Sequence, residues 1–256
     1  MPLGLLGKKL GQTRVYDAKG VISSVTIVLA GPNRVLQCKT QQTDGYNAVQ
    51  LGFGDQKEQR VTKPLLGHIK KFNGVAVKRI REFRNFSKEV KPGDVVGATL
   101  FAPGDYVDAI GVTKGRGFEG VVGRHAFRGG DSTHGAKGWH RRSGAIGQRL
   151  FPGTVMRGMR MPGHMGQVRR TAQNLLVVQV REAENLLLIR GAIPGANGDY
   201  VVIRESKKQP KGWKPHAERP ENIKKAAGKK GHRLPPHYAQ VITEEQRGKI
   251  YKIDDE

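Results

Sequence analysis

Residues 113–170 contain most of the side chains in this chain that could carry out chemistry or bind a charged ligand. These 58 residues include 12 Lys or Arg and 14 Gly, against only two acids, Glu119 and Asp131. Arginine forks match phosphate geometry and stack on bases, while glycine lets backbone amides approach phosphates closely. The stretch therefore predicts packing against a nucleic acid, and folded RNA is read by such shape, phosphate and 2′-hydroxyl contacts.

Histidines and serines in the same stretch raise the possibility of catalysis or metal binding. The four histidines are His125, His134, His140 and His164, spaced 9, 6 and 24 residues apart. No cluster of carboxylates accompanies them, and Ser132 and Ser143 have no Asp partner on a rigid element. Among arginines, a histidine is more simply a phosphate or base contact. We expect no catalytic residue, no metal site and no cofactor.

Two glycine patterns imitate nucleotide-binding loops. Residues 115–120 read G-x-G-x-x-G, but a dinucleotide fingerprint must open a helix and have an acid about 20 residues further on. Here more glycines follow at once, at Gly123, Gly129 and Gly130. The segment GDSTHGAK also departs from a P-loop, because a Ser or Thr must follow the Lys to hold magnesium, and Gly138 stands there. Neither pattern predicts a nucleotide site.

The composition of the whole chain agrees with a polyanionic partner. The 256 residues carry 45 Lys or Arg against 22 Asp or Glu, a net charge of +23. This excess favours a nucleic acid, and no basic amphipathic helix points to a membrane instead. Cys38 is the only cysteine, so no internal disulfide is possible. With no signal peptide and no apolar run long enough to span a bilayer, we expect a cytoplasmic protein.

Strand patterns flank the basic stretch and must position it. Alternating or Val/Ile-rich segments bounded by turn residues predict strands, at residues 14–16, 21–30, 34–40, 46–53, 95–101, 106–112, 175–180, 186–190 and 199–204. Residues 34–40 are expected to pair with residues 21–30. A helix is predicted over Thr62–Phe72, with Thr62 as N-cap and Pro64 in the first turn. Lys78, Arg79, Arg81 and Arg84 form a basic run that is either a solvated strand face or a phosphate contact.

These patterns divide the chain into three parts. Residues 1–112 and 171–204 form a β core with a small α/β insertion at about 54–92. Residues 113–170 leave this core and return to it as an extended loop, so the two flanking strands should be neighbours. Residues 205–256 form a basic, Pro- and Lys-rich C-terminal tail. Because residues 113–170 lack an apolar period, they should be mobile until RNA orders them.

Several separate stretches resemble ribosomal protein three of the bacterial large subunit. They are GLLGKKLGQTRVY near the start, GYNAVQLGFG, RVTKPLLGH, TKGRGFEGVVGRHAFRGG, HG at residues 134–135, GAIGQ, PGTVMRGMRMPGHMG and ENLLLIRGAIPGANG. The resemblance extends from Leu3 to about Arg204. It implies a mainly β fold: a translation-protein-type β-barrel with a small helical insertion and a long, irregular, basic extension loop.

The resemblance also implies a function. Members are structural constituents of the large ribosomal subunit that bind 23S ribosomal RNA, aid early subunit assembly and send the loop toward the peptidyl transferase centre. Its tip would be about residues 139–153. The implied neighbours are the large-subunit proteins fourteen and nineteen, with no membrane and no homo-oligomer. The alternative is an RNA-modifying enzyme that binds through the same loop, and it would need a cofactor fingerprint that the sequence lacks.

The predicted RNA contacts combine the basic stretch with the start of the chain. They are Lys8, Lys9, Lys114, Arg116, Arg124, His125, Arg128, His134, Lys137, Trp139, His140, Arg141, Arg142, Gln148, Arg149, Arg157, Arg160, His164, Arg169 and Arg170. The chain departs from the family pattern at Trp139–Gly147, which reads WHRRSGAIG. Leu150 stands where some members carry a methylated glutamine, so that modification is not carried over.

Overall fold

Six antiparallel strands close into a barrel in a computed structural model that describes residues 3–16, 20–72 and 74–209. Their order around the barrel is β1 (Gly4–Tyr16), β12 (Tyr200–Glu205), β7 (Tyr106–Val112), β10 (Arg169–Arg181), β11 (Leu186–Arg190) and β2 (Ile22–Leu29). Apolar side chains such as Leu5, Val28, Val107, Ile189 and Ile203 fill its core. The predicted mainly β fold with a barrel is confirmed.

A second sheet of four strands is inserted between β2 and β7. Its order is β5 (Val77–Arg84), β4 (Ala48–Asp55), β3 (Asn33–Lys39) and β6 (Val95–Val96). The insertion expected at about residues 54–92 covers only part of this sheet, which begins at Asn33. Several of its buried residues, among them Val35, Leu51 and Phe83, belong to the same apolar cluster as the barrel residues.

The pairing expected for residues 34–40 is wrong. β3 pairs with β4 and β6 and not with β2. Both edges of β2 are already taken, one by β1 and the other by β11. A strand in a closed barrel offers no free edge, so the segment that follows β2 must find its partners elsewhere.

Helical segments are short. The predicted helix is confirmed as α2 (Lys63–Lys71), with Thr62 at the N-cap and Ile69 buried against Leu36 and Val77. The others are α1 (Gln41–Asp44), α3 (Val121–His125) and two 3₁₀ turns, η1 (Glu58–Arg60) and η2 (Ala98–Leu100). Of the strand expected at residues 95–101, only Val95–Val96 forms a strand, because η2 begins at Ala98.

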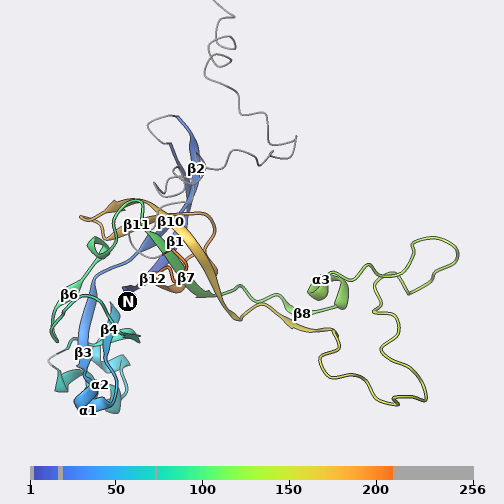
Figure 1. Ribbon diagram of the computed structural model, residues 1–256, viewed down its shortest axis with the longest axis horizontal. Coiled ribbons are helices and arrows are strands. Elements are labelled where there is room, and N and C mark those ends of the chain that lie inside the picture. Colours follow the sequence, from blue (N-terminus) through green and yellow to red (C-terminus); the bar gives the residue numbers. More distant parts are fainter. Residues whose placement is uncertain (1–2, 17–19, 73, 210–256) are drawn as a thin grey trace, which may run out of the picture. The chain divides into compact units, whose positions relative to one another are not determined.

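The basic stretch leaves the barrel from β7 and returns through β10. These two strands pair antiparallel, with Val112 opposite Arg169 and Gly111 opposite Arg170, so the predicted neighbourhood of the flanking strands is confirmed. The stretch is less irregular than expected, since β8 (Gly117–Glu119) pairs with β9 (Gly163–Met165). Between Ala126 and Pro162 the structure has no helix or strand (Figure 1). Most of the predicted C-terminal tail, from residue 210, lies outside the described residues.

Candidate nucleic-acid interface

A two-stranded arm carries the basic stretch away from the barrel strands. We define it as residues 113–119 together with residues 163–168. Its backbone bonds run from Thr113 N to Val168 O (3.0 Å), Gln167 N to Thr113 O (3.1 Å) and Arg116 N to Met165 O (2.8 Å). Gly166 has φ +79°, and a Cβ there would collide with the backbone carbonyl oxygen of Lys114. Only glycine meets both conditions without strain, so the arm depends on this residue.

Cationic side chains gather around the arm. A hollow of about 610 Å³ is lined by six predicted contact residues, Lys114, Arg116, Arg124, His125, His164 and Arg170. The Arg124 guanidinium donates to the Met161 carbonyl (2.8 Å), and a ring nitrogen of His125 lies 3.1 Å from the same oxygen. These bonds hold α3 against the irregular segment that leads back into β9. Within the described part of the chain, no carboxylate pairs with any of the six.

The outer part of the loop is held by backbone contacts and one stacked pair. The Arg142 guanidinium lies over the Trp139 ring at 4.7 Å from its centroid. Gly130 N donates to the His140 carbonyl (3.2 Å), and a ring nitrogen of His140 lies 3.1 Å from the Asp131 carbonyl. Arg142 and Trp139 both remain exposed to solvent in this arrangement.

Most of the predicted contact residues are exposed. The exposed ones beyond the arm are Arg128, His134, Lys137, Trp139, His140, Arg141, Arg142, Gln148, Arg149, Arg157 and Arg160, and Arg169 and Arg170 are exposed on β10. The one ion pair among the described residues of this group joins Arg128 to Asp131 (3.6 Å), and both side chains are open to solvent. Such a pair contributes little energy, so Arg128 stays available to a stronger anion.

Lys9 has a different position from the other predicted contacts. Its side chain is buried and donates to the carbonyls of Ile193 (2.8 Å) and Gly195 (3.0 Å). Burial lowers the pKa of Lys9, and the nearby positive charge of Lys114 lowers it further. Lys9 therefore holds the turn between β11 and β12, while Lys8 beside it is half-exposed.

The tip of the loop exposes apolar side chains that we did not predict as contacts. Leu150 is 90% exposed and Phe151 is 88% exposed. The sequence could have indicated these two residues, because large apolar residues stand there in a stretch that has no apolar period and so cannot join a core. Gly144 and Gly153 turn the chain here with φ +78° and +68°, whereas Gly147 does not have a positive φ.

The G-x-G-x-x-G pattern has no nucleotide-binding context. Residues 117–119 form β8, which pairs antiparallel with β9. The helix that follows β8, α3, has five residues. A Rossmann site needs a parallel strand–helix–strand unit instead. Among the described residues, no group of three or more His, Cys, Asp or Glu could hold a metal ion. None of their helices is long and apolar enough to cross a membrane.

Comparison with known proteins gives a consistent result. The sequence model of a family described as ribosomal protein L3 matches residues 55–187. The chain is 50% identical over 205 residues to the large ribosomal subunit protein uL3 of Deinococcus radiodurans, covering 80% of this chain and 95% of that protein. It is 46% identical over 208 residues to the uL3 of Pseudomonas fluorescens, covering 81% and 99%.

Proposed function

The chain belongs to the ribosomal protein L3 family and is a structural protein of the large ribosomal subunit, and from this premise we propose that residues 113–170 are its main binding surface for 23S ribosomal RNA. The family is structural, and the RNA-modifying enzyme considered above has no support. Its place is on the ribosome in the cytoplasm. One observation carries the proposal: the cations around the arm and along the loop have almost no acidic partners.

Charge neutralisation is the mechanism that this arrangement favours. Each Lys or Arg that meets a phosphate releases condensed counterions, which contributes affinity without reading sequence. Guanidinium groups such as Arg142 over Trp139 add a flat surface for stacking. Because residues 126–162 have neither helix nor strand of their own, their path in the subunit would be set by the RNA around them.

The family resemblance supports three further proposals. The chain joins early in subunit assembly, its loop extends toward the peptidyl transferase centre, and its protein neighbours include the large-subunit proteins fourteen and nineteen. The exposed Leu150 and Phe151 favour the second, since apolar side chains at the end of a loop need a partner to remove them from water.

Salt dependence tests the main proposal. Replacing Arg141, Arg142 and Arg149 with Ala should weaken binding to 23S ribosomal RNA and reduce the slope of log K against log salt by roughly 2–3 units, because three phosphate contacts are removed. The measurement is filter binding of the full chain across a salt series.

The matched control removes the same number of positive charges from the helical segments between β4 and β5. Lys57, Arg60 and Lys63 are exposed around η1 and the start of α2, and replacing them with Ala should leave the slope near that of the wild type. Equal slopes for the wild type and the loop variant would show that these three arginines do not touch phosphate.

A further inference from the structure

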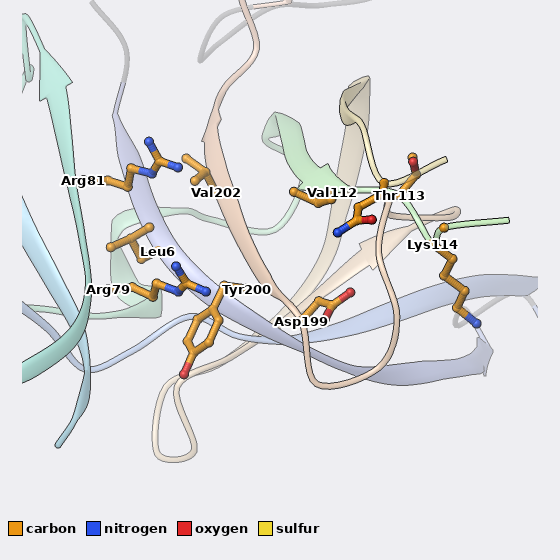
Figure 2. Close-up of a pocket in the computed structure, with 11 residues that line it drawn as sticks. Leu6, Arg79, Arg81, Val112, Thr113, Lys114, Asp199, Tyr200 and Val202 are labelled. Carbon is orange, nitrogen blue, oxygen red and sulfur yellow. The ribbon is translucent and has the colours of Figure 1, made fainter. Parts of the chain in front are cut away.

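A second basic hollow lies between the four-stranded sheet and the barrel. It has a volume of about 420 Å³, and its lining includes Arg79 and Arg81 of β5, Lys114 at the start of the arm, and Asp199 and Tyr200 on the barrel side. Figure 2 shows the two arginines directed from β5 toward Tyr200 and Val202, with Lys114 across the hollow. This hollow shares Thr113 and Lys114 with the one around Arg124 and His164, but only this one is lined by Arg79 and Arg81.

The two arginines occupy the face of the sheet that packs on the barrel. Directly opposed residues of antiparallel strands share a face, and Arg79 is opposite Phe53 while Arg81 is opposite Leu51. Both partners are buried in the core that the sheet shares with the barrel, and so is Phe83, the next residue of β5 on this face. Two charged residues therefore continue an apolar row, yet both are exposed. The hollow beside these two arginines leaves room for a ligand.

The three cations of the hollow face a single carboxylate, that of Asp199. In the described part of the chain, Arg79, Arg81 and Lys114 form no ion pair. The Asp199 carboxylate accepts a hydrogen bond from Ala196 N (2.7 Å), which holds it in its own turn. The Arg79 guanidinium lies 5.2 Å from the centroid of the Tyr200 ring, so its plane is oriented by stacking rather than by an acid.

A smaller hollow extends the positive surface toward β10. It shares Arg81, Tyr200 and Val202 with the first and adds Arg169. Lys114 lies on the segment that leaves the barrel after β7, and Arg169 lies at the start of β10, where the chain returns to the barrel. The cations of the two hollows thus form a line from β5, past Tyr200 and Val202 of β12, to the base of the arm.

We propose that Arg79 and Arg81, at the β5 end of this line of cations, bind the phosphates of an RNA backbone as a second contact outside residues 113–170. The inference rests on the proposed function and assigns a new surface to it. Residues two apart on a strand are separated by about 6.6 Å, which is close to the spacing of successive phosphates in an RNA strand. Arginine forks suit such groups because they bind oxygens in pairs.

The test is the salt dependence of RNA binding by a double variant. R79Q/R81Q in the full chain should bind 23S ribosomal RNA more weakly, and its log–log salt slope should fall by about 1–2 units because two phosphate contacts are lost. Lys57→Gln/Lys63→Gln removes the same charge elsewhere on this sheet unit and should keep the wild-type slope. The single variants Arg79→Gln and Arg81→Gln should each lower the slope by about 1 unit, so the test still stands if the double variant is poorly folded.

The outcomes separate this inference from the proposed function. A wild-type chain that does not bind the RNA would overturn both. A wild-type chain that binds the RNA, with an unchanged slope in R79Q/R81Q and in both single variants, would overturn the second contact alone. A melting temperature raised by inorganic phosphate in the wild type only, with equal RNA binding by both proteins, would show a site for free phosphate and would also overturn it.

Discussion

Lysine and arginine residues in this chain have two different roles, which depend on what surrounds each side chain. Lys9 donates to two backbone carbonyls and is buried, so its charge serves the fold. Arg141 and Arg149 are exposed, and among the described residues neither has an acidic partner. A charge that the protein leaves unpaired in a basic loop is repelled by its neighbours, and this repulsion is relieved when a polyanion binds.

Lys9 should affect stability rather than RNA affinity. Lys9→Met should lower the free energy of unfolding by about 1–3 kcal/mol, because the carbonyls of Ile193 and Gly195 lose their donor, while the salt slope of RNA binding stays unchanged. Urea denaturation and filter binding measure the two effects. Lys8→Met, at a half-exposed position, should alter stability by less than about 0.5 kcal/mol. A flatter salt slope in Lys9→Met with normal stability would contradict the structural role.

The apolar tip should matter only in the ribosome. Leu150→Ala/Phe151→Ala should leave the melting temperature of the free protein nearly unchanged, because both side chains are almost fully exposed and leave no cavity. Ribosomes that carry the variant should show slower peptide-bond formation or an altered response to drugs bound at the peptidyl transferase centre. Normal peptidyl transfer together with a normal drug response would mean that the tip does not extend to that centre.

The arm is the element that connects the barrel to the basic loop. Its strands continue β7 and β10, so the hydrogen bonding of the barrel passes directly into it. α3 then turns the chain, and Arg124 and His125 tie it back to Met161. These local contacts fix where the loop starts and ends although residues 126–162 have no regular structure.

Gly166 should be the weak point of the arm. Gly166→Ala places a side chain in left-handed backbone, which costs about 1–2 kcal/mol, and also brings it into the Lys114 carbonyl. Amide hydrogen exchange at Thr113 and Arg116 should accelerate by at least about tenfold. Gly117→Ala, with φ +72° and nothing within 4 Å of the added carbon, carries the same backbone strain without the collision and should have a smaller effect. Equal exchange in the two variants would show that the collision is relieved at no cost.

The molecule as a whole separates its apolar core from the proposed binding loop. The buried apolar cluster is formed by the barrel and the four-stranded sheet, and none of its residues comes from 113–170. The barrel closes on itself and has no free edge to pair with another chain. A large unpaired charge can therefore be carried on the loop without weakening the core.

Excision of the outer loop should confirm this separation. Replacing residues 127–160 with a short Gly-Ser linker keeps the contacts between α3 and Met161, so the cut ends stay close. The free energy of unfolding should be unchanged or higher by up to about 2 kcal/mol, because a shorter loop costs less entropy to close. Affinity for 23S ribosomal RNA should fall steeply. Loss of cooperative unfolding would show that the loop contributes to the core after all.

Local patterns in the sequence determined the elements and the interface. Apolar, Val- and Ile-rich runs bounded by turn residues located β2, β7 and β11 to within a residue or two, and Thr62 with Pro64 marked the start of α2. Charge and glycine content predicted that residues 113–170 form an insertion that binds a polyanion, and the family motifs implied that this polyanion is 23S ribosomal RNA. These properties are local, because each depends on residues close together along the chain.

Only the tertiary structure decided partners and burial. β3 does not pair with β2, because β1 and β11 occupy both edges of β2. Lys9 became buried because the turn at Ile193–Gly195, far away in sequence, presented carbonyls to it. Arg79 and Arg81 formed a hollow with Lys114 because β5 faces the barrel near the arm. Each outcome depends on contacts between distant segments, and a local pattern of residues carries no information about which distant segment will meet it.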